Sequence, residues 1–159
     1  MFIPGNGAHV VKITESPPQT VQSILADRKI KKVFHYALFD LRFMIGRWNC
    51  PVENVTCTKV ASKILDPNCK DHTLKSLLQR HLHVEISKDA RLSNWMSPLL
   101  TEAQLKYAVQ DVVHLPLLLS ELRTKLEAKG LWPLAVGCFR FLPFELQLQL
   151  RELRDVFEY

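Results

Sequence analysis

The feature that most constrains the fold is a strongly capped amphipathic segment that begins after Thr101. Thr101 and Gln104 have the spacing of a capping box, in which each side chain satisfies a backbone N–H of the first helical turn. Apolar residues then recur at helical spacing, at Leu105, Ala108, Val109, Val112, Leu115, Leu119 and Leu122. Pro116 is expected to kink this helix and Gly130 to end it. The pattern predicts a long helix over 102–129.

The first part of the chain alternates between strand and helix patterns. Residues 8–13 and 31–35 are predicted as short strands, and residues 16–27 between them as a helix with Ser16 as its N-cap. This order predicts a parallel pair of strands in an α/β domain. Two strands alone make a marginally stable sheet. The chain is therefore expected to begin part-way through its sheet, with residues 1–3 as the stub of another strand.

The remaining segments favour helices. Helices are predicted at 38–47, 58–65 and 73–81. Residues 51–56 are expected to form a connector, residues 84–100 an irregular segment, and residues 131–159 two short helices. The chain of 159 residues is therefore expected to form a single α/β domain with many helices.

Charge and cysteine content limit the class of protein. The net charge of +5 suits a polyanionic partner but also fits an ordinary basic protein. The four cysteines show no Cys-x-x-Cys spacing, which disfavours a structural zinc site. Reduced thiols, the lack of a signal-peptide pattern over Met1–Gly7 and the lack of an apolar run near about 18 residues lead us to expect a cytoplasmic protein without a membrane span.

Tyr107 and Asp111 are the first candidates for chemistry. They are four residues apart on the predicted helix and so lie on one face. A carboxylate there can bind a divalent cation, and a phenol one turn earlier can orient a water molecule bound to it. Taken alone, such a pair is more commonly a core tyrosine followed by a solvated aspartate.

Asp40 is the second candidate. It is predicted to lie in the first turn of a helix that follows the strand ending at His35. Ligands of open α/β sheets gather at the carboxyl ends of strands. An aspartate at a helix start is also favoured by the helix dipole alone, so this position leaves both interpretations open.

Together the two elements form a motif set. The chain reads Phe34-His35-x-Ala37-x-x-Asp40-Leu41, followed by Ser93-x-Trp95, Pro98-Leu99, Thr101-x-x-Gln104 and Tyr107-Ala108-x-x-Asp111-Val112. This set closely resembles the ribonuclease D-like 3′–5′ exonucleases of the DEDD superfamily, in the subgroup whose third motif contains tyrosine. The segments Cys57–Ser62 and Asp71–Leu77 also match and lean toward bacterial members that degrade short oligoribonucleotides. The resemblance extends from about Gly7 to Trp132.

The resemblance implies an RNase H-like fold and hydrolysis assisted by two Mg²⁺ or Mn²⁺ ions. Asp40 and Asp111 match two of the four metal-binding carboxylates, and Tyr107 matches the tyrosine that positions the attacking water. His35 and Ala37 are implied to line the site near the 3′-terminal nucleotide. The family often has Asn where Tyr36 stands.

Trp95 is a candidate for stacking on a base, with half-buried packing as the alternative. Lys29, Lys31 and Lys32 form a basic cluster that suits either phosphate contact or a solvated turn. The implied partners are 3′ ends of single-stranded RNA or DNA and short oligonucleotides.

The first family motif, Asp-x-Glu, does not occur in the sequence. The acidic residues before Asp40 are Glu15 and Asp27, and both follow the predicted first strand. We therefore expect an N-terminally truncated sheet and impaired hydrolysis. The alternatives are an inactive homologue that binds nucleic acid or a protein partner, and a homo-oligomer formed through the exposed sheet edge. Residues 1–132 are assigned to the exonuclease-like domain, and residues 133–159 to a helical extension packed on it.

Overall fold

The computed structural model describes residues 1–13, 16–86, 93–153 and 155–158. At its centre lie two parallel strands, β3 (Lys32–Phe34) and β4 (Val55–Cys57). The chain between them forms helix α2 (Ala37–Leu41), which continues as a π-helical segment, η1 (Arg42–Arg47). The predicted helix over 38–47 is thus α-helical only in its first part. This β-α-β unit carries Asp40 close to the carboxyl end of β3.

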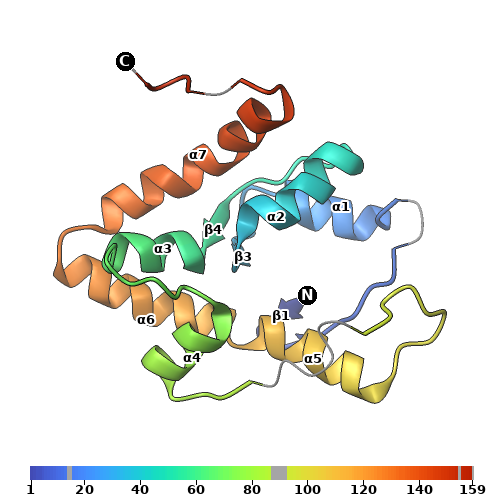
Figure 1. The fold of residues 1–159 in the computed structure, drawn as a ribbon. Helices are drawn as coiled ribbons and strands as arrows, with labels where there is room; N and C mark the ends of the chain where they lie inside the picture. The colour runs from blue at the N-terminus through green and yellow to red at the C-terminus, as the bar shows by residue number, and fades with distance from the viewer. Residues whose placement is uncertain (14–15, 87–92, 154, 159) are drawn as a thin grey trace.

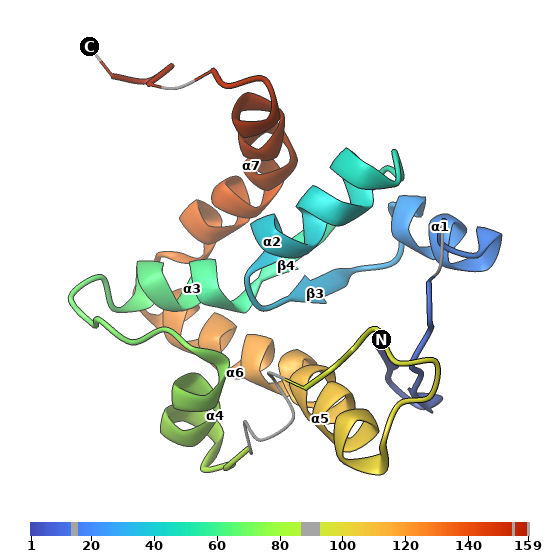
Figure 2. The ribbon, with the colours of Figure 1, turned by 45° about the vertical axis from the view of Figure 1, so that its right-hand side comes forward.

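Helices cover the small sheet on both faces (Figures 1 and 2). Helices α2 and α7 (Trp132–Leu150) contact β4 on one side, and α6 (Leu115–Ala128) contacts β3 on the other. Helix α3 (Thr58–Leu65) follows β4 directly and packs on both α6 and α7, while α4 (Leu74–Leu82) packs on α6. Coverage of both faces is the usual arrangement for parallel strands.

The core is made largely by one stripe of each long helix. In α6 the stripe consists of Leu118, Leu122 and Leu126, each with 0% exposure. In α7 it consists of Ala135, Phe139, Leu142 and Leu146. Burying one such leucine side chain contributes about 2 kcal/mol relative to leaving it exposed. Packing of these stripes, more than pairing of the short strands, therefore holds the fold together.

A second, smaller unit lies beneath the sheet in Figure 1. Strands β1 (Phe2–Ile3) and β2 (Gly7–Ala8) form an antiparallel hairpin, and Gly5 at its turn has a φ of +81°, which favours glycine. Helix α5 (Glu102–Val113) packs on this hairpin and on α6. Helix α1 (Gln19–Ala26) connects the hairpin side of the molecule to β3.

The prediction of a strand over 8–13 is wrong beyond its first residue. The turn that follows Ile3 folds Gly7–Ala8 back onto Phe2–Ile3, and the His9 N–H donates to the Met1 carbonyl at 2.8 Å. The predicted strand over 31–35 is present as β3, but its parallel partner is β4, which lies partly within the predicted connector over 51–56. Three residues are too few to show the alternation by which strands are recognised.

Helix boundaries also differ from the predictions. Helix 102–129 is divided at His114 into α5 and α6, because Pro116 has no N–H to donate and fits best in a first helical turn. The tail forms one helix of 19 residues through Pro143, not two short ones, since its apolar stripe is buried along its length. The N-cap of α1 is Pro18 and not Ser16, and it makes no side-chain cap.

Among the described residues, no helix is both long and apolar enough to cross a bilayer. The described parts of the predicted irregular segment, residues 84–86 and 93–100, contain no helix or strand. Residues 87–92 of that segment lie outside the described residues.

Candidate active site

The turn from β3 into α2 builds the first half of the site. After Phe34 the chain passes through His35 and Tyr36, and Tyr36 adopts φ 104° and ψ 54°. A left-handed conformation is costly for most side chains, whereas Asn tolerates it better. The family resemblance implies Asn at this position, and the backbone explains that preference. The turn thus brings His35, Ala37 and Asp40 together within one short segment of the chain.

His35 is held at the end of β3 by a neighbouring hydroxyl. Its Nδ1 lies 2.9 Å from Oγ1 of Thr58, and that hydroxyl is 3.3 Å from the carbonyl oxygen of Phe34. Burial, assisted by the nearby charge of Lys59, lowers the pKa of His35 to about 4. A hydrogen bond with the backbone of His72 acts in the opposite direction but is the weaker influence. His35 is therefore neutral at pH 7 and has a fixed ring orientation.

Asp40 lies in the first turn of α2, where the helix dipole favours a negative charge. Burial nevertheless raises the pKa of its carboxyl group to about 6. The desolvation cost thus outweighs the dipole, and the carboxylate is a group that a cation would stabilise.

Tyr107 and Asp111 build the second half on α5. A hydrogen bond from the Tyr107 side chain favours the ionised form of Asp111, as expected for residues one turn apart. Burial is the larger influence and raises the pKa of the Asp111 carboxyl group. Asp111 also lies in the last turn of its helix, where the dipole disfavours a carboxylate. Two features of its setting therefore oppose a charge that a bound cation would stabilise.

Trp95 lies beside this pair. Its ring centroid is 6.0 Å from that of Tyr107, with the rings inclined by 55°, and the Trp95 side chain is 37% exposed. Stacking of a base on Trp95 stays a prediction, and the contact with Tyr107 is what the structure shows. Ala37 is 1% exposed, and its N–H points to Sγ of Cys57 at 3.5 Å. Its implied nucleotide contact also stays a prediction.

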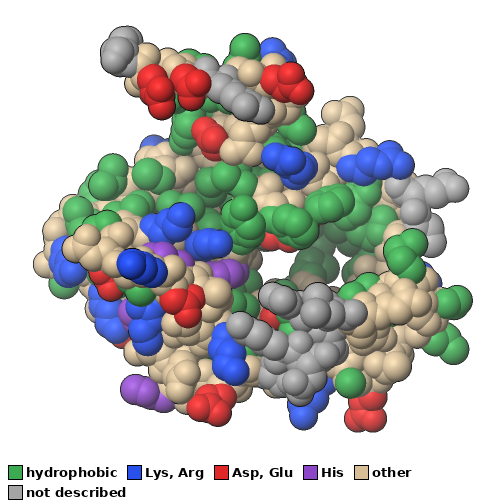
Figure 3. All heavy atoms as spheres, in the orientation of Figure 1, with side chains coloured by type: hydrophobic (Ala, Val, Ile, Leu, Met, Phe, Trp, Pro, Cys, Tyr) green, Lys and Arg blue, Asp and Glu red, His purple; other side chains and the backbone are tan. Residues whose placement is uncertain are grey.

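The packing of α6 places the two halves relative to each other. Helix α6 contacts β3, and Asp111 lies three residues before the junction of α5 and α6 at His114. In Figures 1 and 2, α5 lies on the opposite side of β3 from α2. Figure 3 shows a band of hydrophobic side chains over α2 and η1, with a hollow directly below it.

Three exposed aromatic side chains at the start of α2 and along α2 and η1, called the aromatic band below, are not among the candidates from the motif set. Tyr36, Phe39 and Phe43 are 52%, 58% and 48% exposed, and successive ring centroids are 6.2 and 5.4 Å apart. Nζ of Lys59 lies 4.1 Å from the Tyr36 ring centroid. The spacing of Tyr36, Phe39 and Phe43 places them on one helix face, a signal present in the sequence but indistinguishable there from a buried face.

The donor set for a divalent cation is incomplete. Mg²⁺ prefers oxygen ligands, and Asp40 and Asp111 provide carboxylate oxygens. However, the part of the chain that the structure describes forms no group of three or more His, Cys, Asp or Glu able to hold an ion. The described residues therefore do not make up a full metal site.

The 3′–5′ exonuclease domain family matches residues 6–127, well over half of the chain. The chain belongs to this family. Ribonuclease D of Zymomonas mobilis is 32% identical over 116 residues, which are 69% of this chain and 28% of that protein. Exosome complex component 10 of Mus musculus is 30% identical over 132 residues, 83% of this chain and 14% of that protein. The chain thus spans less than a third of these relatives.

Comparison with solved structures covers a larger share of both chains. NrnC of Brucella melitensis superimposes with a TM-score of 0.84 at 35% identity, over 91% of this chain and 71% of that one. The likeness confirms both the resemblance stated from the motifs and the RNase H-like exonuclease fold. Asp40, Tyr107 and Asp111 all fall within the residues that the family matches.

Proposed function

We propose that this protein acts in 3′–5′ exonucleolytic hydrolysis of RNA or short oligonucleotides, with Asp40, Tyr107 and Asp111 at the reaction centre. The observation that carries this proposal is the electrostatic setting of the two aspartates. Burial raises the pKa of each carboxyl group, and α2 and α5, which carry the two groups, lie on opposite sides of β3 (Figures 1 and 2). Carboxyl groups whose pKa is raised by burial are enriched at functional sites.

The relatives support the choice of substrate. They include ribonuclease D, and NrnC has been solved with bound pGG and with bound Mg²⁺. In this chain the exposed rings of Tyr36, Phe39 and Phe43 provide apolar faces beside Asp40, which suit stacking with the bases of a single strand.

The roles of the residues follow from their surroundings. Tyr107 orients a water molecule next to Asp111, and neutral His35 offers a hydrogen bond without a competing positive charge. A divalent ion at this site would supply an activated water and stabilise the leaving oxygen, and Asp40 and Asp111 are the residues of this chain that would hold it. Because two carboxylates hold such ions weakly, we propose that hydrolysis by this chain alone is slow or absent.

The same incomplete donor set favours a second candidate function. A homologue that binds nucleic acid or a protein partner without cleaving needs the aromatic band and the basic charge but not a full set of carboxylates. Under this alternative, the raised pKa of Asp40 is a remnant of the family fold and has no catalytic consequence.

One assay separates the two candidates. A 5′-labelled oligoribonucleotide is incubated with saturating Mn²⁺ or Mg²⁺, and shortening of the labelled strand is measured for the wild type and Asp111→Ala. We expect slow stepwise shortening from the 3′ end for the wild type and a loss of roughly 100-fold or more for the variant. Identical failure of both proteins to cleave, with binding retained, supports the non-catalytic homologue instead.

A further inference from the structure

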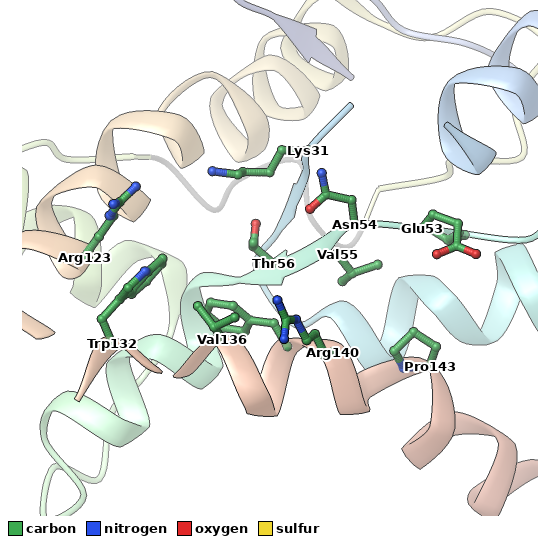
Figure 4. A pocket seen from close by; sticks show the side chains of 12 residues that line it. Lys31, Glu53, Asn54, Val55, Thr56, Arg123, Trp132, Val136, Arg140 and Pro143 are labelled. Atoms are coloured by element: carbon green, nitrogen blue, oxygen red, sulfur yellow. The ribbon is translucent and has the colours of Figure 1, made fainter. Parts of the chain in front are cut away.

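A second pocket lies away from Asp40 and Asp111, along the edge of β4 that does not pair with β3. Its volume is about 410 Å³, and its walls come from the start of β3, the segment over 52–56, α6 and α7 (Figure 4). Among the described strands, β4 pairs only with β3, and residues 52–56 at and before β4 line this pocket.

Three cationic side chains from three different elements line the pocket. They are Lys31 before β3, Arg123 on α6 and Arg140 on α7, and Figure 4 shows them around Thr56 and Trp132. Within the described ranges, the side chains of Lys31 and Arg140 have no hydrogen-bond or ion-pair partner. Their charges are therefore free to meet a ligand.

The acidic complement of the pocket is small. Glu53 is the acidic side chain in its lining, and that carboxylate lies 3.4 Å from Arg28, outside the pocket. Arg123 shares its charge with Glu127 at 2.7 Å, while its guanidinium carbon lies 5.2 Å from the Trp132 ring centroid. The pocket thus combines an excess of positive charge with an aromatic wall, the combination that recognises a nucleic-acid backbone.

The position of the pocket relative to the reaction centre is fixed by β3. Lys31 precedes the strand, and His35 follows it at the other end. Four residues of extended chain span about 13 Å at 3.3 Å per residue. At about 3.4 Å per stacked nucleotide, a stacked strand that reaches both places has about four nucleotides between them.

We propose that this pocket is a second binding site for the phosphodiester backbone of a single-stranded polynucleotide, engaged by Lys31 and Arg140 while the 3′ end lies near Asp40. The inference rests on the proposed function, because it assigns a further contact to the same substrate. It predicts that long oligonucleotides bind more tightly than short ones, and that the difference depends on these two side chains.

The test is direct binding without cleavage. Fluorescence anisotropy in EDTA compares oligoribonucleotides of about 12 and about 3 nucleotides on the wild type and on Lys31→Gln/Arg140→Gln. We expect the variant to lose about 10-fold in affinity for the longer ligand and to bind the shorter one unchanged. The slope of log K against log salt concentration for the longer ligand should become shallower by about 1.4, from two lost phosphate contacts at about 0.7 each.

A matched variant controls for the change in net charge. Lys63→Gln/Lys70→Gln removes two exposed lysines elsewhere and should leave the affinity for both ligands within about twofold of the wild type. Equal losses in the two variants would show a nonspecific charge effect and would overturn the proposal.

Other outcomes are also decisive. If the wild type binds the longer ligand and the pocket variant binds it equally well, the second site is wrong while the proposed function stands. If the wild type binds neither ligand, the proposed function itself fails. A change in oligomeric state of the variant by light scattering, with unchanged affinity, would overturn the second site and assign the open β4 edge to contact between copies of the chain.

Discussion

The two halves of the candidate site are held in different ways. The segment with His35 and Asp40 starts from β3 and continues into α2, whose Leu41 is 0% exposed. The half on α5 lies on a helix whose single buried side chain, among those described, is Gln104. The core thus fixes one half, whereas capping and a small hairpin hold the other. Two carboxylates of one site can thus be held by different amounts of buried packing. The half on α5, which has less of it, is the more prone to local unfolding.

The largest expected difference comes from removing one apolar side chain from each half. Leu41→Ala should lower the free energy of unfolding by about 3 kcal/mol, because it leaves a cavity in the core. Leu105→Ala on α5, where the side chain is 39% exposed, should cost less than about 1 kcal/mol. Urea denaturation of both variants measures this, and equal costs would contradict the contrast in anchoring.

The next effect concerns charge burial. Burial raises the pKa of Asp40 to about 6, so ionisation destabilises the folded state as pH rises from about 4 to 6, and the loss persists above that range. Asp40→Asn should therefore stabilise the protein by roughly 2–3 kcal/mol at pH 7.5 in EDTA, and by little at pH 4. Asp111→Asn should give a smaller gain. Denaturation at both pH values checks this, and a pH-independent gain for Asp40→Asn would refute the burial explanation.

A third variant tests the capping that holds α5. The Thr101 hydroxyl accepts from the Gln104 N–H at 3.2 Å, and the Gln104 side chain accepts from the Thr101 N–H at 2.8 Å. Thr101→Ala should cost about 1 kcal/mol, expressed as local opening of α5. Hydrogen exchange should quicken in α5 and not in α6. Thr101→Ser, which keeps the hydroxyl, is the control expected to exchange like the wild type.

The smallest effect concerns the turn before α2. Tyr36→Asn should relieve about 1 kcal/mol of backbone strain at φ 104°, partly offset by the lost contact with Lys59, leaving a net gain of roughly 0.5 kcal/mol. Tyr36→Ala removes the ring but keeps the strain, so it should be less stable than the Asn variant. Thermal denaturation of the pair compares them directly, and a more stable Ala variant would speak against strain.

Local patterns in the sequence were sufficient to locate several elements. Helix α3 follows its predicted range of 58–65, and α5 begins where the capping box placed it. The position of Asp40 in a first helical turn after a strand was also predicted correctly. In each case the determining interactions lie within a few residues, so that spacing alone contains the information.

Features that depend on distant packing were not predictable in the same way. Strand β4 is short, and it is a strand because it pairs with β3. Lys32 of β3 pairs with Val55 of β4, which lies 23 residues later in the chain. Helix α7 continues through Pro143 because buried contacts offset the lost hydrogen bond. The raised pKa of Asp40 and the exposure of Phe39 likewise arise from tertiary burial, on which the motif contains no information.

The packing of α5 on the β1–β2 hairpin has a consequence for the order of folding. Those contacts join residues roughly a hundred positions apart in the chain, whereas β3, α2 and β4 are close neighbours in sequence. Closing so long a loop is entropically costly and slows the formation of its contacts. We therefore expect the Asp40 half to form early and Asp111 to reach its place last, so that competence of the site is acquired only at the final step of folding.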